Sequence, residues 1–380
     1  MGNEMFVYKN NRRLRSGYTT GTCAAAASKA AALMLLTQSL VDRVSVDTPK
    51  GVTLELPVEE PSIRPDRASC AVRKDGGDDV DATDGLLIFS EVSFSDSPGI
   101  TVDGGRGVGR VTRKGLDQPP GEAAINSTPR RMICESVSQI AGDLGCERGL
   151  SVVVSVPEGE TAADRTFNPR MGICGGISII GTSGIVEPMS EKALIDTIRA
   201  EISMRTASGH RYILAVPGNY GADYACDSLG LPEDDAVRCS NFIGETVDGA
   251  CEFGASGLLI VGNLGKMVKV AGGIMNTHSR SADCRMEILT ANAMLCGGDA
   301  PLAERMMSCV TTDDALGVLK ECGMMEPTMD RIIGRMQEFL DYRCRRSIEV
   351  GAVVFSSEYG LLGMTEGARG LMRKIKGESA

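Results

Sequence analysis

The chain changes its hydrophobic pattern near the middle, and its two halves predict two kinds of sheet. Residues 41–49 and 51–58 alternate apolar and polar positions on either side of a Pro-Lys-Gly turn, which predicts a β-hairpin with one buried face. Further elements are expected as strands at Leu86–Val92, Ile100–Val102 and Leu150–Val156, and as a helix at about Thr128–Leu144. The first half is therefore expected to be an α+β domain.

From about Gly172 the pattern becomes apolar strand, glycine turn and helix, which is typical of a parallel sheet with crossover connections. The apolar strands are Ile177–Ile180, Tyr212–Val216 and Leu258–Val261, and they end in G-T-S-G, P-G-N and G-N-L-G-K. Turns after parallel strands gather at the carboxyl edge of the sheet, where open α/β folds bind ligands. A helical stretch at about 282–343 and a last strand at Glu349–Phe355 complete this half.

Together the patterns predict an α/β protein of two domains. An N-terminal α+β domain is expected at residues 1–165, followed by a Rossmann-like α/β domain with a parallel sheet at residues 166–380. A chain of 380 residues is long enough for two such cores. The boundary is placed where proline and glycine interrupt regular structure, at Pro157, Gly159, Pro169 and Gly172.

The segment Ser16–Leu36 runs from a hydroxyl-rich glycine turn directly into an alanine-rich helix. Gly17 and Gly21 permit a turn and the close approach of a ligand, and Thr20 or Thr22 can cap the helix. A helix start also attracts negative groups. The pattern therefore predicts either a seat for an anionic ligand or a well-capped core helix.

Composition excludes several classes of protein. The net charge of −10 gives no basis for a large basic face, so no nucleic-acid partner is expected. The 13 cysteines are scattered without any C-x-x-C pair, which favours reduced core residues in a cytoplasmic protein and predicts no metal site. The first ten residues lack an apolar signal region, and no window approaches the roughly 18 apolar residues of a membrane span. We therefore expect a cytoplasmic protein with no membrane partner.

The glycine turns are not those of a nicotinamide or ATP site. The G-T-S-G turn lacks the full G-x-G-x-x-G, and no acidic residue follows Tyr212–Val216, the second expected strand, to hold a ribose. The segment Gly262–Lys266 is too short for a phosphate loop. These turns still offer backbone to a ligand, with Asn219 as a substitute polar contact.

An acidic loop at Asp75–Asp84 is a second candidate for chemistry. Crowded carboxylates raise one another's pKa, which would suit Asp78 or Asp79 to proton transfer. A calcium loop is disfavoured because the bidentate Glu is missing. A solvated turn remains the alternative.

Eight segments, in order along nearly the whole chain, resemble the cobalt-precorrin-5B C1-methyltransferases of anaerobic cobalamin biosynthesis. They are G-Y-T-T-G-T-C-A-A-A-A from Gly17, V-R-K-D-G-G-D-D-V-D-A-T from Val72, A-A-I-N-x-x-P-R from Ala123, G-G-I-S-I-I-G-T-S-G-I-V from Gly175, V-P-G-N from Val216, S-N-F-I-G from Ser240, G-x-x-G-K from Gly262 and T-H-S-x-x-A-D-x-R-M-E from Thr277.

The resemblance implies methylation of C1 of cobalt-precorrin-5B to cobalt-precorrin-6A, with S-adenosylmethionine as the methyl donor. Cobalt then enters only as part of the tetrapyrrole substrate, and a homo-oligomer is possible. Two alternatives stay open: a carrier that binds the cobalt tetrapyrrole without catalysis, and a nicotinamide reductase of a neighbouring step. Calorimetry with S-adenosylhomocysteine separates a transferase from a carrier.

With this resemblance, the motif residues divide into three groups. The methyl donor is expected at the turns, on Gly181, Thr182, Ser183, Gly184, Gly218, Asn219, Gly262 and Lys266. The residues expected to bind the carboxylates of the substrate are Thr19, Thr20, Gly21, Thr22, Lys74, Asn126 and Arg130. The candidate bases are His278, Asp78 and Asp79. Relatives often carry His where this chain has Asp84, Tyr220, Asn263 and Asn276. Only His278 then remains as an imidazole in a matching motif, with a hydrogen-bonded structural His as its alternative.

Overall fold

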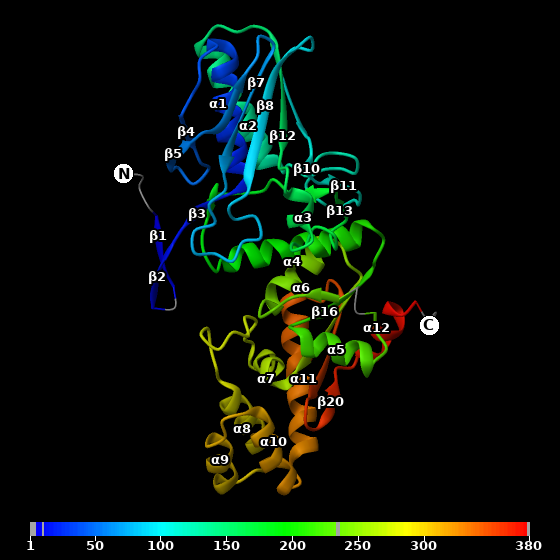
Figure 1. Ribbon diagram of the computed structural model, residues 1–380. Helices are drawn as coiled ribbons and strands as arrows, with labels where there is room; N and C mark the ends of the chain where they lie inside the picture. The colour runs from blue at the N-terminus through cyan, green and yellow to red at the C-terminus, as the bar shows by residue number, and fades with distance from the viewer. Residues whose placement is uncertain (1–4, 10, 233–235, 378–380) are drawn as a thin grey trace. The chain divides into compact units, whose positions relative to one another are not determined.

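The computed structural model describes residues 5–9, 11–232 and 236–377. Of the first ten residues, which were considered above for a signal region, residues 1–4 and 10 lie outside this range. The chain forms two compact units, Met1–Glu191 and Lys192–Ala380 (Figure 1). The sequence pattern had placed the boundary at residue 165. The structure instead keeps residues 166–191 with the first unit, because short strands in this segment pair with strands of that unit.

The N-terminal unit is built on one five-stranded sheet. Its strands lie in the order β6 (Glu59–Ile63), β7 (Arg67–Arg73), β8 (Leu87–Ser95), β12 (Gly149–Ser155) and β9 (Ile100–Gly104). Only β12 and β9 run parallel, and the other pairs are antiparallel. The predicted hairpin is confirmed as β4 (Arg43–Asp47) and β5 (Thr53–Pro57).

Helix α1 (Thr20–Thr37) is the centre of this unit's core. It packs against β7, β8 and helix α2 (Ser127–Asp143). Ala24–Ala27 and Ala30–Ala32 are all fully buried, because a helix with such small side chains can approach both the sheet and its neighbouring helix closely. The buried Ser28 hydroxyl meets that of Ser90 on β8 at 2.8 Å.

Short strand pairs join the N-terminal end of the chain and the segment before residue 190 to this unit. They are β1 (Phe6–Lys9) with β2 (Arg12–Arg15), β3 (Gly17–Tyr18) with β15 (Ile185–Val186), β10 (Gly107–Val108) with β14 (Gly176–Ile177), and β11 (Arg110–Val111) with β13 (Ile173–Cys174), beside the short helix α3 (Gly159–Ala163). The expected strand Ile177–Ile180 is therefore part of the N-terminal unit and not of the C-terminal sheet. This pairing moves the boundary to residue 191.

The C-terminal unit contains a second five-stranded sheet, in which four strands are parallel. Its order is β17 (Ala236–Arg238), β16 (Tyr212–Val216), β18 (Gly257–Asn263), β19 (Glu349–Ser356) and the antiparallel β20 (Gly360–Met364). Three of these strands are the ones expected from their apolar runs. The three-residue β17 was missed, so Tyr212–Val216 is the first strand of this sheet and not the second.

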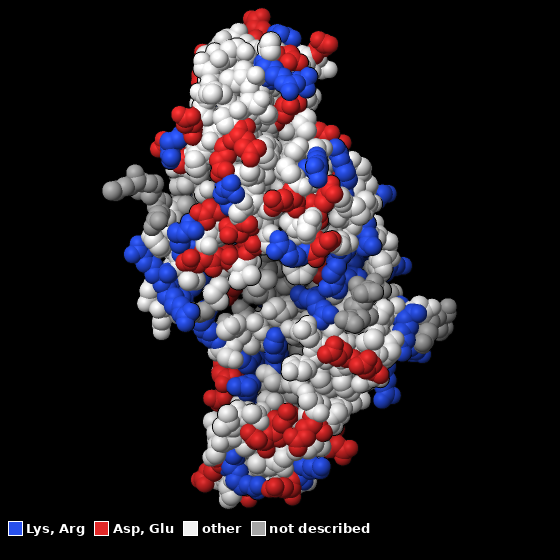
Figure 2. Space-filling model, in the orientation of Figure 1, with Lys and Arg blue, Asp and Glu red and all other residues white. Residues whose placement is uncertain are grey.

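Helices surround this sheet and extend beyond it. They are α4 (Glu191–Ala207), α5 (Asn219–Asp227), α6 (Ile243–Glu252), α7 (Leu264–Met267), the 3₁₀ helix η2 (Val268–Gly272), α8 (Arg285–Leu295), α9 (Ala300–Met307), α10 (Thr312–Glu321), α11 (Met325–Cys344) and α12 (Ala368–Ile375). The expected helical stretch at 282–343 is thus four separate helices. Over the residues that the structure describes, no helix is both long and apolar enough to cross a membrane. Acidic and basic side chains are interspersed on the face seen in Figure 2.

Candidate active site

A cleft of about 770 Å³ opens in the C-terminal unit at the carboxyl ends of β16, β18 and β19. It is lined by Pro217, Gly218, Tyr220, Gly221, Asn241, Gly262, Asn263, Gly265, Lys266, Lys269, Thr277, His278, Ser279, Arg285 and Ser357. All of these residues belong to one unit. The site therefore follows from the parallel sheet alone, since its strand ends and the loops after them meet at one edge.

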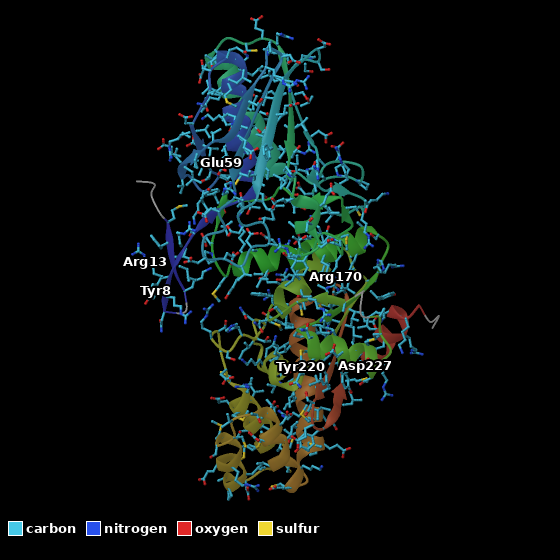
Figure 3. All side chains as sticks on the ribbon, viewed as in Figure 1. Tyr8, Arg13, Glu59, Arg170, Tyr220 and Asp227 are labelled. Atoms are coloured by element: carbon cyan, nitrogen blue, oxygen red, sulfur yellow. The ribbon has the colours of Figure 1, made fainter. Side chains whose placement is uncertain are left out.

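Two glycines lie at this edge, and they serve it in different ways. A Cβ atom on Gly221 would lie 2.6 Å from the Val261 carbonyl oxygen, so only glycine lets α5 pack this tightly on β18. Gly218 is different, because a Cβ there would meet nothing within 4 Å. Gly218 leaves open space beside the cleft. The next residues begin α5, where the first backbone N–H groups have no carbonyl within the helix. Tyr220, labelled in Figure 3, is 76% exposed at this helix start.

The cleft is cationic. Lys266 donates from Nζ to the Pro217 carbonyl oxygen at 2.9 Å and to that of Ser240 at 3.4 Å. Because an ammonium group has three hydrogens, these bonds leave one for a ligand. Burial lowers the pKa of Lys266 below its ordinary value. Arg285 adds a guanidinium held by Asp283, whose pKa this arginine lowers through its hydrogen bonds.

His278 lies on the loop between η2 and α8, and its side chain is exposed. Its backbone N–H donates to Asn276 Oδ1 at 3.1 Å, and its Nδ1 accepts from the Arg280 backbone N–H at 3.0 Å. Lys269, which is 1% exposed, donates from Nζ to the carbonyl oxygens of Thr277 and Ala282 on this loop. The loop is thus held by its own hydrogen bonds and by those of Lys269.

Of the residues expected to bind the donor, Gly218, Gly262 and Lys266 line this cleft, and the candidate base His278 lies there with them. Asn219 lies beside Gly218, and its Oδ1 accepts from the Arg238 guanidinium at 3.1 Å.

The G-T-S-G turn, Gly181 to Gly184 with Thr182 and Ser183, is not part of this edge. It lies in the N-terminal unit against the start of α1, where Thr22 Oγ1 donates to the Gly184 carbonyl oxygen at 2.7 Å. A Cβ atom on Gly181, whose φ is +142°, would lie 2.2 Å from Thr19 Oγ1. The turn therefore packs against the helix start and leaves no room for a ligand between them.

The same contact corrects the expected anion seat at Thr19–Thr22. The Gly21 N–H donates to the Ile180 carbonyl oxygen at 2.9 Å, and the Thr22 N–H donates to Thr19 Oγ1 at 3.2 Å. Thr20 Oγ1 accepts from the Ile180 N–H at 2.9 Å, and the Thr20 residue is 3% exposed. The chain itself occupies the helix start, so these residues form the well-capped core helix that was the alternative.

The acidic loop is also tied into the N-terminal unit. Asp78 Oδ2 accepts from the Arg15 N–H at 2.7 Å, and Asp79 Oδ1 accepts from the Met189 N–H at 3.0 Å. Lys74 is 2% exposed and donates to Asp81 Oδ2 at 2.8 Å. Burial alone would raise the pKa of Asp81, but Lys74 outweighs it and the pKa is lowered. Because its side chain is 1% exposed, the Lys74 ammonium is buried in this internal ion pair and has no surface to offer a substrate.

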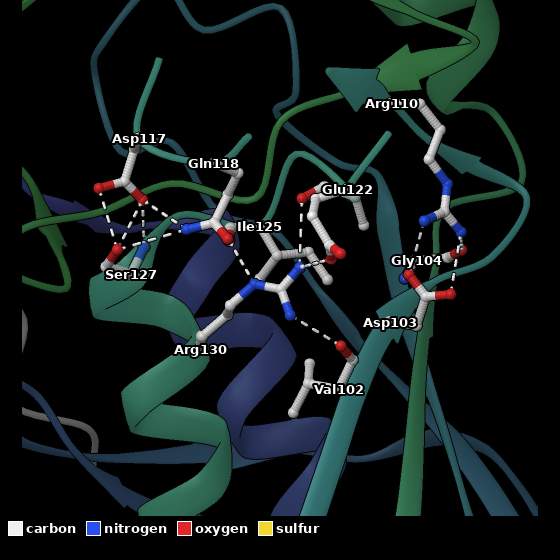
Figure 4. A network of polar contacts seen from close by, with 11 residues as sticks. Val102, Asp103, Gly104, Arg110, Asp117, Gln118, Glu122, Ile125, Ser127 and Arg130 are labelled. Atoms are coloured by element: carbon white, nitrogen blue, oxygen red, sulfur yellow. Dashed lines mark hydrogen bonds and ion pairs between the residues drawn. The ribbon is translucent and has the colours of Figure 1, made fainter. Parts of the chain in front are cut away.

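Arg130 lies in the first turn of α2 (Figure 4), and Asn126 is the N-cap residue before this helix. The Arg130 guanidinium donates to the carbonyl oxygens of Ile125 at 3.0 Å and Val102 at 2.8 Å, and it pairs with Glu122 at 3.4 Å. The Asn126 N–H donates to the Ile179 carbonyl oxygen, so the segment of the G-T-S-G turn is held here too. Arg130 therefore joins backbone segments within its unit, and its N–H groups already have partners in the protein.

Sequence reasoning missed several residues of the cleft. Asn241 and Arg285 stand inside quoted motifs, S-N-F-I-G and T-H-S-x-x-A-D-x-R-M-E, and could have been found there. Lys269 and Ser357 have no such signal, because only the folded sheet brings them to the edge. Among the described residues, no group of three or more His, Cys, Asp or Glu side chains is arranged to hold a metal ion.

Comparison with known proteins finds the same family that the sequence motifs resemble. The CbiD family model matches residues 7–188, and the model of the CbiD C-terminal domain matches residues 276–366. A protein of Ruminiclostridium cellulolyticum named cobalt-precorrin-5B C(1)-methyltransferase is 47% identical over 93% of this chain and 92% of its own length. A protein of the same name from Alkaliphilus metalliredigens is 42% identical over 99% of this chain and 98% of its own.

A crystal structure of the cobalamin biosynthesis protein cbiD from Archaeoglobus fulgidus is 29% identical, with a TM-score of 0.40, over 73% of this chain and 86% of that one. The two family models and the full-length relatives lead to one conclusion: the chain belongs to the CbiD family.

Proposed function

We propose that this chain transfers a methyl group to C1 of cobalt-precorrin-5B, giving cobalt-precorrin-6A in anaerobic cobalamin biosynthesis, with S-adenosylmethionine as the donor. The observation that carries this is the identity of 42–47%, over more than nine tenths of both chains, with proteins named for that reaction. Cobalt then belongs to the substrate.

We further propose that the C-terminal sheet is Rossmann-like and that its cleft holds the donor. In chain order, its parallel strands run 2-1-3-4 across the sheet, so the order reverses between β16 and β18. Ligands of open α/β sheets bind at such a switch point. Gly218 and Asn219 lie where β16 leads into α5, Gly262 lies near the end of β18, and Lys266 lies on α7, which follows β18 directly.

The residues of the cleft fit this donor. The carboxylate of the donor can accept a hydrogen bond from the third ammonium hydrogen of Lys266. The rest of the donor molecule has room beside Gly218, which has no side chain. A sulfonium that donates methyl supplies the difficult chemistry itself. The protein must hold donor and ring carbon in line and exclude water, and such orientation is worth about 7 to 11 kcal/mol of barrier.

The reaction is tested by incubating the full chain with S-adenosylmethionine and cobalt-precorrin-5B. We expect a product heavier by one methyl group and an equal amount of S-adenosylhomocysteine, both measured by mass spectrometry. A protein that binds the tetrapyrrole but neither binds S-adenosylhomocysteine nor forms product would be a carrier, and the proposal would be wrong.

The role of Lys266 is tested by Lys266→Met, with the exposed Lys376→Met as matched control. Loss of one charge-assisted hydrogen bond should weaken S-adenosylhomocysteine binding by about 10-fold or more, measured by calorimetry. Lys376→Met should bind like the wild type. Equal affinity in all three proteins would remove Lys266 from the donor site.

A further inference from the structure

Lys269 is a buried cation whose contacts all lead to one loop. Its side chain is 1% exposed, and its Nζ donates to the carbonyl oxygens of Thr277 at 3.1 Å and Ala282 at 2.8 Å. The carboxylate of Asp283 lies 3.6 Å away. A buried ammonium costs free energy unless it is paired and hydrogen-bonded, and this loop supplies both kinds of partner. One side chain on η2 thus holds both ends of the segment 277–282.

Between these two ends the loop closes on His278. The backbone N–H groups of Ser281 and Ala282 donate to the His278 carbonyl oxygen at 2.9 and 3.3 Å. The Arg280 N–H donates to the ring nitrogen Nδ1 at 3.0 Å. The imidazole is therefore fixed by the same turn that Lys269 holds from below.

This last bond decides which ring nitrogen carries the proton. A nitrogen that accepts an N–H must have its lone pair free, so neutral His278 carries its hydrogen on Nε2. Nε2 can then donate a hydrogen bond, but it cannot accept a proton. The only basic atom of the ring, Nδ1, is already occupied by the Arg280 N–H.

We propose that Lys269 is a positioning residue that clamps both ends of the loop 277–282, and that the loop presents His278 to the cleft as a hydrogen-bond donor through Nε2 rather than as a base. The part that concerns a ligand rests on the methyl-transfer function proposed above. A carboxylate or carbonyl oxygen of the donor or the tetrapyrrole is the kind of group that such a donor takes.

The tautomer can be measured directly because the chain contains only two histidines. His210 Nδ1 lies 3.2 Å from the Arg205 carbonyl oxygen, so this nitrogen carries the proton and His210 has the opposite tautomer. In protein labelled with ¹⁵N-histidine, NMR at about pH 8, above the ordinary histidine pKa of about 6.5, should show one ring of each kind. The variant His210→Gln assigns the signals. A His278 with its proton on Nδ1 overturns the proposal, whatever the enzyme does.

The clamp is tested in Lys269→Met, which keeps an unbranched side chain as far as Cε but removes the ammonium. We expect the His278 signals to move toward a mixture of tautomers and the amides of 277–282 to exchange faster with solvent. Lys266→Met, three residues away, is the matched control: it should weaken donor binding yet keep the His278 tautomer. An unchanged tautomer and unchanged exchange in folded Lys269→Met would contradict the clamp. If Lys269→Met does not fold, the exposed partner is changed instead, and Asp283→Asn should give the same shifts to a smaller extent.

The donor role is tested by His278→Gln and His278→Ala. A glutamine amide can donate a hydrogen bond but cannot serve as a base at neutral pH. We therefore expect His278→Gln to keep kcat within about threefold of the wild type, with His278→Ala raising KM by about 10-fold. A loss of about 10²- to 10⁴-fold in kcat in both variants is the mark of general base catalysis and would contradict the proposal. Should the protein prove not to be a methyltransferase, the two NMR results still decide the clamp and the tautomer.

Discussion

Two helix starts in this chain both have glycine beside them and do different things. At α1, the N–H groups of Gly21 and Thr22 are used by Ile180 and Thr19, and Gly181 packs against the helix start. At α5, Gly218 has open space beside it and lines a cleft of about 770 Å³. The difference is whether a distant segment of the chain fills the helix start. Glycine at a helix start therefore indicates a ligand only where the fold leaves that helix start open.

The largest effect that separates the two helix starts is expected from Gly181→Val. A Cβ atom would collide with Thr19 Oγ1, and the φ of +142° is one that valine rarely adopts. Overpacking and backbone strain together should lower the free energy of unfolding by about 4 kcal/mol, measured by urea unfolding. The matched control is Gly175→Val, at an exposed glycine with φ +80° and no atom near its Cβ. Equal stability of the two variants would contradict the tight packing described here.

The buried ion pair of Lys74 and Asp81 gives the next largest effect. Asp81→Asn leaves the Lys74 ammonium, 2% exposed, without its charge partner and should cost about 3 kcal/mol of stability. Because the folded pKa of Asp81 is lowered, its contribution is present above the unfolded pKa of about 3.9 and is lost as the pH falls through the folded value.

Urea unfolding of the wild type and Asp81→Asn between about pH 7 and pH 3 tests this sign. The gap between the two proteins should narrow as the solution becomes acid. A gap that stays constant would show that Asp81 stabilises through something other than its charge.

The smallest of these effects is expected from Thr20→Val. The change removes the acceptor of the Ile180 N–H and should lower the free energy of unfolding by about 1 to 2 kcal/mol. Neither KM for the tetrapyrrole nor the affinity for S-adenosylhomocysteine should change in the folded protein. A raised KM at unchanged stability would restore the substrate role that the sequence suggests for Thr20.

The regular elements of the fold could be predicted because their patterns are local. The alternation in β4 and β5 and the apolar runs of β16, β18 and β19 each mark an element without reference to the rest of the chain. The three-residue β17 is too short to show a period. The apolar run at Ile177–Ile180 resembles a core strand, yet it pairs with residues far away, among them Gly107–Val108.

The site could be predicted only in part, for the same reason. Gly218 follows β16, Gly262 lies near the end of β18, and Lys266 follows β18; both strands were correctly identified, so the meeting of these residues at one edge follows from the sheet. The G-T-S-G turn was assigned to that edge because it also follows an apolar run. Its true position depends on contacts of Gly184 and Ile180 with Thr22 and Gly21, about 160 residues earlier in the chain. No local pattern contains that information.

The most direct test of this difference between the two helix starts is calorimetry of S-adenosylhomocysteine with Gly218→Leu. Gly218 is exposed and has room for a Cβ, so the variant should fold, with Gly334→Leu on α11 as the control at another exposed glycine without near atoms. We predict that Gly218→Leu weakens binding by about 100-fold, because the side chain enters the cleft, while Gly334→Leu and folded Thr20→Val bind like the wild type. Unchanged affinity in Gly218→Leu together with lost affinity in Thr20→Val would place the donor at the start of α1 and contradict this account.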